Sequence, residues 1–262
     1  MNMLLQKTFL AGVAITAITL ATTTCHAHSG EHLTGYHQQD GQDHNEFFVP
    51  NNEQTEGKNA VRPRVLPLDS KPFGQSYGDW AADFVRWLYS IPAARNPIFN
   101  SENTNCTQPQ HGKVWFLGTA NTLASCEIPK GKAVLLQLGS YVDTYPCPDP
   151  TFVPSAGQTL EAFLTVDAKF WLDTLTPVPN NLRIDGKLII GDPQKQEVTS
   201  GLFNLTGDLS LLKYDGCITG TSQQAVVDGY WAMIVGLRPG LHKFEFILNG
   251  KVKNTMNVKV ED

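Results

Sequence analysis

Tight-turn signals in the C-terminal third constrain the fold more than any other feature of this chain. Asp185-Gly186 and Asn249-Gly250 are typical of two-residue type I′ hairpins, and Arg238-Pro239-Gly240 marks a further turn. A strand is expected between the turns at residues 238–240 and 249–250. Every second residue there lies on one face of it: His242, Phe244, Phe246 and Leu248. Short strands at regular spacing are typical of an antiparallel β-sandwich, so we predict a mainly β fold of the jelly-roll or immunoglobulin-like (Ig-like) kind.

Two amphipathic segments predict helices that flank this sandwich. The first is expected to follow Ser76, which has the spacing of a capping box with Asp79, and to end before Pro92. Its apolar stripe fits a core-facing side better than a sugar or cofactor platform; the stripe consists of Trp80, Phe84, Trp87, Leu88 and Ile91. The second helix is expected over residues 159–175, and a strand over 132–139 precedes it.

The first 27 residues have the order of a secretory signal peptide. Lys7 precedes an apolar run from Phe9 to Ala21, and a short polar stretch then ends at the small residue Ala27. The run is shorter than the ~20 residues that cross a bilayer. Cys25 leaves a lipoprotein signal as the alternative, although the residues around it depart from a lipobox. We expect cleavage after Ala27, a secreted or periplasmic location, and no integral membrane segment in the mature chain.

Composition divides the rest of the chain into two regions. Residues 28–72 are polar, without helical or strand periodicity, and are expected to form a disordered, His-rich leader. Residues 73–262 carry the β pattern and are expected to form one domain. With 20 Lys+Arg against 25 Asp+Glu, the net charge is −5 and there is no basic run. A nucleic acid partner is therefore not expected, and no pattern identifies a protein partner.

Four cysteines remain after the predicted cleavage: Cys106, Cys126, Cys147 and Cys217. Four cysteines in an exported protein predict two disulfides with three possible connectivities. Pairing of neighbours in the sequence is the simplest choice, so we favour Cys106–Cys126 and Cys147–Cys217. No pair has the spacing of a CxxC redox motif or zinc ribbon, which favours structural bridges over thiol or metal chemistry.

Histidine is concentrated in the leader, which contains His28, His32, His37 and His44, interleaved with Asp and Glu. Imidazole and carboxylate groups are competent ligands for divalent Zn or Cu. The spacing matches no preorganised motif, so the cluster is either a weak metal-binding segment or a solubilising tail. Cleavage after Ala27 would make His28 the N-terminal residue, which could then chelate copper as in a histidine brace. In known proteins of that kind, however, the first histidine leads directly into the fold.

A polar-aromatic grouping supplies weak candidates for a catalytic site in the domain. Asp228 and Tyr230 precede Trp231, and His242 follows the turn at residues 238–240. If the strands on either side of this turn form a hairpin, an Asp–His pair in a cleft could serve as general acid and base. A core histidine bonded to backbone is the more ordinary interpretation of His242. The sequence has no GxSxG, HExxH, P-loop or GxGxxG motif.

Four ordered motifs resemble a group of uncharacterised secreted bacterial proteins. The motifs are YGDWAADFVRWLYSIP, VWFLGT, CEIPKGKAVLL and DGYWAMIVGLRPGLHKFEF, and the resemblance covers most of Phe73 to about Phe246. The corresponding patterns of that group are YGxWxxxxxxW, VWFLxGT, CxxPxGKA and DGYWxxxxxLxPGxH. The resemblance implies a single exported domain and brings no activity, and the His-rich leader lies outside it.

Two hypotheses of function follow from the sequence. The first is an exported, non-enzymatic β-sandwich whose His-rich leader binds divalent metal weakly. The alternative is a secreted carbohydrate-active enzyme or carbohydrate-binding protein that uses a cleft of carboxylates and aromatic rings. The second would be undermined if Asp228, Tyr230, Trp231 and His242 proved to be fully buried with no adjacent cleft.

Overall fold

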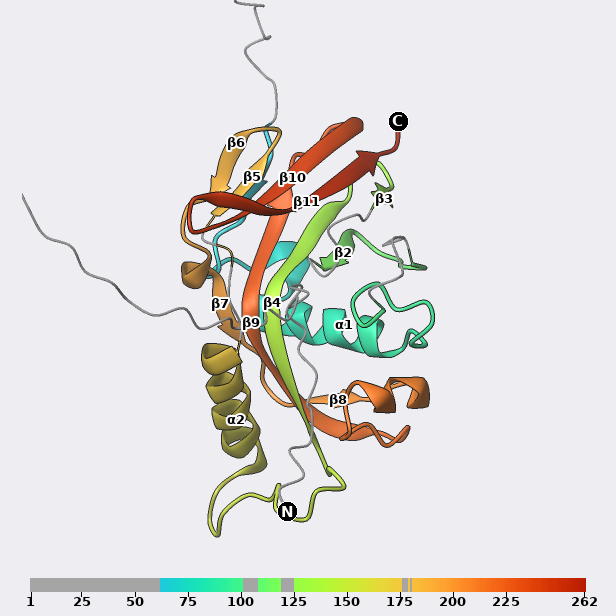
Figure 1. The fold of residues 1–262 in the computed structure, drawn as a ribbon, viewed down its shortest axis with the longest axis vertical. Coiled ribbons are helices and arrows are strands. Elements are labelled where there is room, and N and C mark those ends of the chain that lie inside the picture. The colour runs from blue at the N-terminus through green and yellow to red at the C-terminus, as the bar shows by residue number, and fades with distance from the viewer. Residues whose placement is uncertain (1–61, 101–107, 119–124, 176–178, 180) are drawn as a thin grey trace, which may run out of the picture. The chain divides into compact units, whose positions relative to one another are not determined.

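The computed structural model describes residues 62–100, 108–118, 125–175, 179 and 181–262. The predicted signal peptide and the His-rich segment at 28–44 lie outside the described residues. The described part is rich in strands, which form two sheets, and it contains two α-helices (Figure 1). Among the described residues, no helix has both the length and the apolar character needed to cross a membrane.

The first sheet is built around two long central strands, β4 and β9, which run antiparallel side by side (Figure 1). Its order is β1-β9-β4-β2, and β7 and β8 also pair with β9. The strands are β1 (Arg64–Val65), β2 (Val114–Gly118), β4 (Ala133–Tyr145), β7 (Glu197–Thr199), β8 (Phe203–Leu205) and β9 (Gln223–Val235).

The second sheet has the order β3-β11-β10-β5-β6. Its strands are β3 (Ser125–Ile128), β5 (Asn181–Ile184), β6 (Lys187–Ile190), β10 (Gly240–Leu248) and β11 (Lys251–Val260). The hairpins β5–β6 and β10–β11 turn where the sequence predicts. Asp185 and Asn249 both have positive φ, 52° and 51°, as type I′ turns require.

The two α-helices are α1 (Tyr77–Tyr89) and α2 (Leu160–Leu175). Ser76 is the N-cap of α1, and its side chain accepts a hydrogen bond from the backbone N–H of Asp79, whose carboxylate accepts one from the Ser76 N–H. The predicted capping box is therefore confirmed. Short 3-10 turns lie at Pro72–Gly74, Pro193–Gln196 and Leu209–Lys213.

The core lies on both faces of the first sheet, because alternate residues of β9 point to opposite sides. Trp231 and Met233 pack with Phe84 and Leu88 of α1 on one face; the rings of Phe84 and Trp231 are 5.1 Å apart, edge to face. The other face, with Tyr230 and further apolar residues, packs against the second sheet and α2. The first sheet is thus covered on both sides.

The sandwich-like fold with two helices is confirmed, but its sheets are mixed rather than purely antiparallel. β2 is parallel to β4, and β3 is parallel to β11. The chain passes from β2 in the first sheet to β3 in the second and back to β4, so β2 and β4 are not joined as a hairpin. The expected hairpin across residues 238–240 is also wrong, because β9 and β10 belong to different sheets.

Candidate functional site

Two of the three predicted catalytic candidates lie together on the face of β9 that α2 covers. α2 packs against β4 and β9, and Asp228 and Tyr230 are 0 % and 5 % exposed. Asp228 lies opposite Tyr141 of β4 on one side and Thr199 of β7 on the other. Trp231 points to the other face and is fully buried against α1.

Asp228 is a buried carboxyl group that accepts a hydrogen bond from one donor among the described residues. The Thr199 hydroxyl donates to its Oδ1 at 2.7 Å, while its Oδ2 has no hydrogen-bond partner among the described residues. Burial raises the pKa of Asp228 from 3.8 to about 6, against the opposing effect of the Thr199 hydrogen bond; the nearby Glu197 charge raises it further. Asp228 can therefore gain or lose a proton close to neutral pH.

An ion-pair network joins α2 to β7 beside this carboxyl group. The Lys169 ammonium pairs with Glu197 of β7 and, at 3.4 Å, with Asp173 one turn along α2. The hydrogen bond to Glu197 is the main cause of the raised pKa of Lys169. Burial raises the pKa of Tyr230 to about 12, with the charges of Glu197 and Asp173 adding to the effect. Lys169 thus stays protonated and Tyr230 neutral near pH 7.

Tyr141 extends the set of polar groups under α2. Its ring stacks on Trp171 of α2 at 6.1 Å, nearly parallel, and its hydroxyl has no hydrogen-bond partner among the described residues. Burial, followed by the negative charges of Asp143 and Asp167, raises the pKa of Tyr141. Tyr141 is therefore a neutral phenol at physiological pH.

His242, the third catalytic candidate, lies in the second sheet and does not meet Asp228. Its Nδ1 is 2.7 Å from Asp185 Oδ2 and its Nε2 is 2.8 Å from the carbonyl oxygen of Arg238. The carbonyl can only accept, so Nε2 carries a proton. The same Asp185 carboxylate accepts a hydrogen bond from the Lys243 backbone N–H. His242 therefore joins the β5–β6 turn to β10, and the structure brings no Asp228–His242 pair together.

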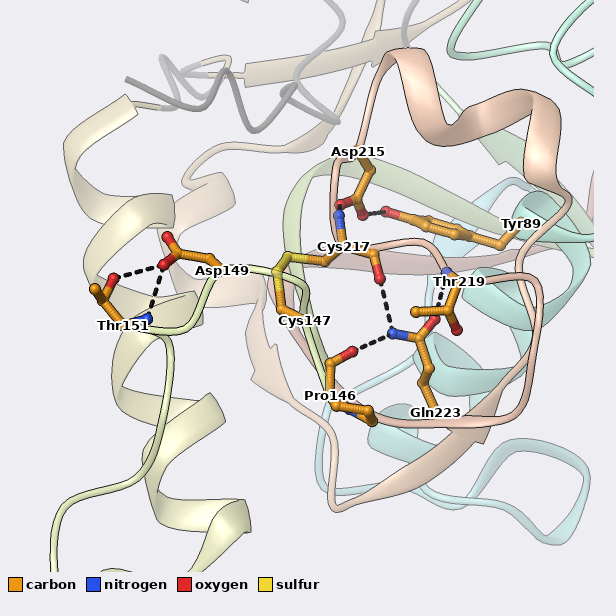
Figure 2. Close-up of a disulfide and its surroundings, with 9 residues drawn as sticks. All are labelled: Tyr89, Pro146, Cys147, Asp149, Thr151, Asp215, Cys217, Thr219 and Gln223. Carbon is orange, nitrogen blue, oxygen red and sulfur yellow. Dashed lines mark hydrogen bonds between the residues drawn. A yellow bond between two sulfur atoms is a disulfide. The ribbon is translucent and has the colours of Figure 1, made fainter. Parts of the chain in front are cut away.

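The Cys147–Cys217 disulfide is present, as the sequence predicts (Figure 2). Next to it, the Gln223 side-chain amide donates to the carbonyl oxygens of Pro146, at 2.7 Å, and Cys217, at 2.8 Å. Cys126, on β3, is also disulfide-bonded, and its predicted partner, Cys106, lies outside the described residues. The bridge and Gln223 fasten the segment after β4 to the segment before β9.

The predicted metal ligands His28, His32, His37 and His44 lie outside the described residues. Within the part of the chain that the structure does describe, no group of three or more His, Cys, Asp or Glu side chains could hold a metal ion. The carboxylates around Asp228 therefore offer an acid–base group and an ion pair, rather than a metal site.

Thr199, Lys169 and Glu197 complete the candidate site around Asp228, and the sequence does not indicate them. Thr199 and Glu197 belong to a three-residue strand, which is too short to show a period of two. Lys169 and Asp173 have the i, i+4 spacing of a helical ion pair, a signal that indicates a surface pair and not a neighbour of Asp228.

A scan against protein-family models and searches of curated proteins and solved structures found no match to this chain. The fold and the site define a disulfide-containing protein of two mixed β-sheets, with one helix on each face of the larger sheet and a buried carboxyl group under α2.

Proposed function

We propose that this is an exported, non-enzymatic β-sandwich protein that binds divalent metal, zinc or copper, through its His-rich leader. The observation that carries the proposal is the density of ligands there. Four of the seven histidines of the chain fall between His28 and His44, with Glu31, Asp40 and Asp43 among them. Imidazole and carboxylate donors at such density can capture a borderline metal ion without a preformed cage, at an affinity reduced by the ordering that capture requires.

The histidines of the folded part give less support to a metal site in the domain. Both ring nitrogens of His242 lie within hydrogen-bond distance of acceptors in Asp185 and Arg238, so a metal would have to displace an existing contact. His111 is the other histidine after residue 44. We therefore infer that the domain carries the leader. The group of secreted proteins that the motifs resemble implies no activity for the domain.

The disulfide supports the proposed export. Disulfides form and persist in oxidising compartments such as the periplasm or the extracellular space, and Cys147–Cys217 is bridged. The signal-like residues 1–27 favour the same location. Intact-mass analysis of the exported protein would test the cleavage after Ala27.

The alternative, a carbohydrate-active enzyme or carbohydrate-binding protein, is suggested by four side chains, of which three lie inside the fold and the fourth, His242, contacts Asp185 and Arg238. Asp228, Tyr230 and Trp231 are all buried, so their side chains do not offer a surface on which a sugar could lie. Catalysis on a glycosidic bond needs two carboxyl groups that both reach the substrate, and Asp228 lies beneath α2 instead.

The proposal is tested by isothermal titration of the exported protein with Zn²⁺ and, separately, Cu²⁺. We expect binding by the wild type, loss of the binding heat when His28, His32, His37 and His44 are all changed to Gln, and unchanged binding by His111→Gln, the matched control. Retention of binding by the four-histidine variant, or no binding by the wild type, would overturn the proposal.

A further inference from the structure

The contact between α2 and the first sheet contains an ionisable group where an apolar residue would be expected. Leu164, Ala168 and Leu172 of α2 are fully buried, and Ala168 and Leu172 belong to the same apolar cluster as Tyr141 and Tyr230. Asp228 lies directly opposite Tyr141 of β4 and two residues before Tyr230 on β9. Its fully buried Oδ2 has no hydrogen-bond partner in the described part of the chain.

The charged and titratable groups around Asp228 lie on every element packed against it: Glu197 on β7, Lys169 and Asp173 on α2, Tyr230 on β9 and Tyr141 on β4. Asp143 of β4 and Asp167 of α2 act on Tyr141 in the same contact. The 3-10 turn that leads into β7 carries Lys195, which is exposed and pairs with Asp192. The tyrosines are neutral, so one ammonium faces two carboxylates. Ionised Asp228 adds a third.

We propose that Asp228 is a pH-sensitive latch for α2: in its neutral form it allows the helix to pack on the sheet, and in its ionised form it loosens that packing. Loss of the proton places a negative charge in a buried contact, where the Thr199 hydroxyl is its one hydrogen-bond donor among the described residues. The nearby Lys169 ammonium is already paired with Glu197 and Asp173. Opening of α2 lets water reach the carboxylate and separates it from Asp173. Burial of a charge without full pairing is costly, so ionisation favours the open arrangement.

The free-energy cost of ionising Asp228 inside the closed contact is the reason why its pKa is raised to about 6. The group binds its proton more tightly with α2 closed than it would in water, where the ordinary pKa is 3.8. By linkage, closure is favoured at low pH and progressively lost as the pH rises through about 6. Opening should therefore become about tenfold more frequent between pH 5 and pH 8, if the open form restores the ordinary pKa.

Hydrogen–deuterium exchange of the α2 amides, 160–175, tests the latch on the full exported protein. Asp228→Asn keeps the shape and the acceptor for Thr199 but cannot ionise. Comparison of the two proteins at each pH cancels the intrinsic pH dependence of exchange. We expect the wild type to lose about tenfold in α2 protection relative to the variant between pH 5 and pH 8. The β10–β11 hairpin should show no such change, because the opening is local.

Two results would overturn the proposal. One is an equal change of α2 exchange with pH in the wild type and Asp228→Asn; the other is the same change in the β10–β11 hairpin as in α2. Thr199→Val provides an independent test if the asparagine variant fails to fold. The Thr199 hydrogen bond favours the ionised form and lowers the pKa of Asp228, so its removal should move the midpoint of α2 opening to higher pH. An unchanged or lower midpoint contradicts the proposal.

Discussion

At Gly229 the backbones of β9 and β4 lie too close together for a side chain. A Cβ atom there would lie 2.5 Å from the Ser140 Cβ and 2.8 Å from the Gly139 carbonyl oxygen. Neither atom can move without shifting β4, so Gly229→Ala should destabilise the fold by about 2 kcal/mol, measured by urea unfolding. Gly191→Ala is the matched control, since its nearest neighbour is the Leu188 Cδ2 at 3.7 Å. Equal stability of the two variants would contradict this account.

Also at the scale of single residues, the sequence predicts the members of the candidate site better than it predicts the contacts between them. Asp228 and Tyr230 stand out in the sequence and do lie together. The partner assigned to them, His242, is wrong because the turn at residues 238–240 carries the chain to another sheet. Thr199 could not be found, since its hydrogen bond depends on the register of a strand only three residues long.

The start of α1 provides a prediction for a whole element. Ser76→Ala removes the side-chain acceptor for the Asp79 N–H and should cost about 1 kcal/mol in denaturant unfolding at pH 7. Hydrogen bonds from Ser76 lower the pKa of Asp79, so the carboxylate's contribution is present above its ordinary value of 3.8 and lost as the pH falls below it. The cost should therefore shrink at pH 3.

Ser76→Thr is the control for the cap, because threonine supplies the same oxygen and should retain most of the stability. A serine-to-alanine cost that is as large at pH 3 as at pH 7 would show that the hydrogen bond from the Ser76 hydroxyl to the Asp79 carboxylate contributes nothing.

Elements with a strong local pattern were predictable, and elements without one were not. α1, α2 and the hairpins β5–β6 and β10–β11 occur where periodicity and turn residues place them. The strand expected to end at residue 139 continues to Tyr145 as β4, beyond an irregularity between Gln137 and Gly139. β9 is also long, from Gln223 to Val235. Both long strands are buried on two faces, so neither shows the alternation that marks a half-exposed strand.

At the scale of the whole molecule, the order of the strands could not be predicted from the sequence, because it depends on contacts between distant segments. β3 is the clearest case, because it lies parallel to β11, with Cys126 opposite Val258. The covalent link between Cys147 and Cys217 is different, because the small number of cysteines leaves few possible pairings. That bridge joins the ends of the two central strands, where Tyr145 lies opposite Gln224.

This disulfide should act mainly on the unfolded chain, since it closes a loop across a sequence separation of 70 residues. Changing Cys147 and Cys217 together to Ala should cost about 4 kcal/mol of unfolding free energy by loop-closure entropy, measured in guanidinium chloride. The Gln223 hydrogen bonds to the carbonyl oxygens of Pro146 and Cys217 do not need the sulfur atoms, so the native arrangement should persist. The unfolded state should expand and the m-value rise. A loss below about 1 kcal/mol with an unchanged m-value would instead mean that the unfolded chain stays compact here without the bridge.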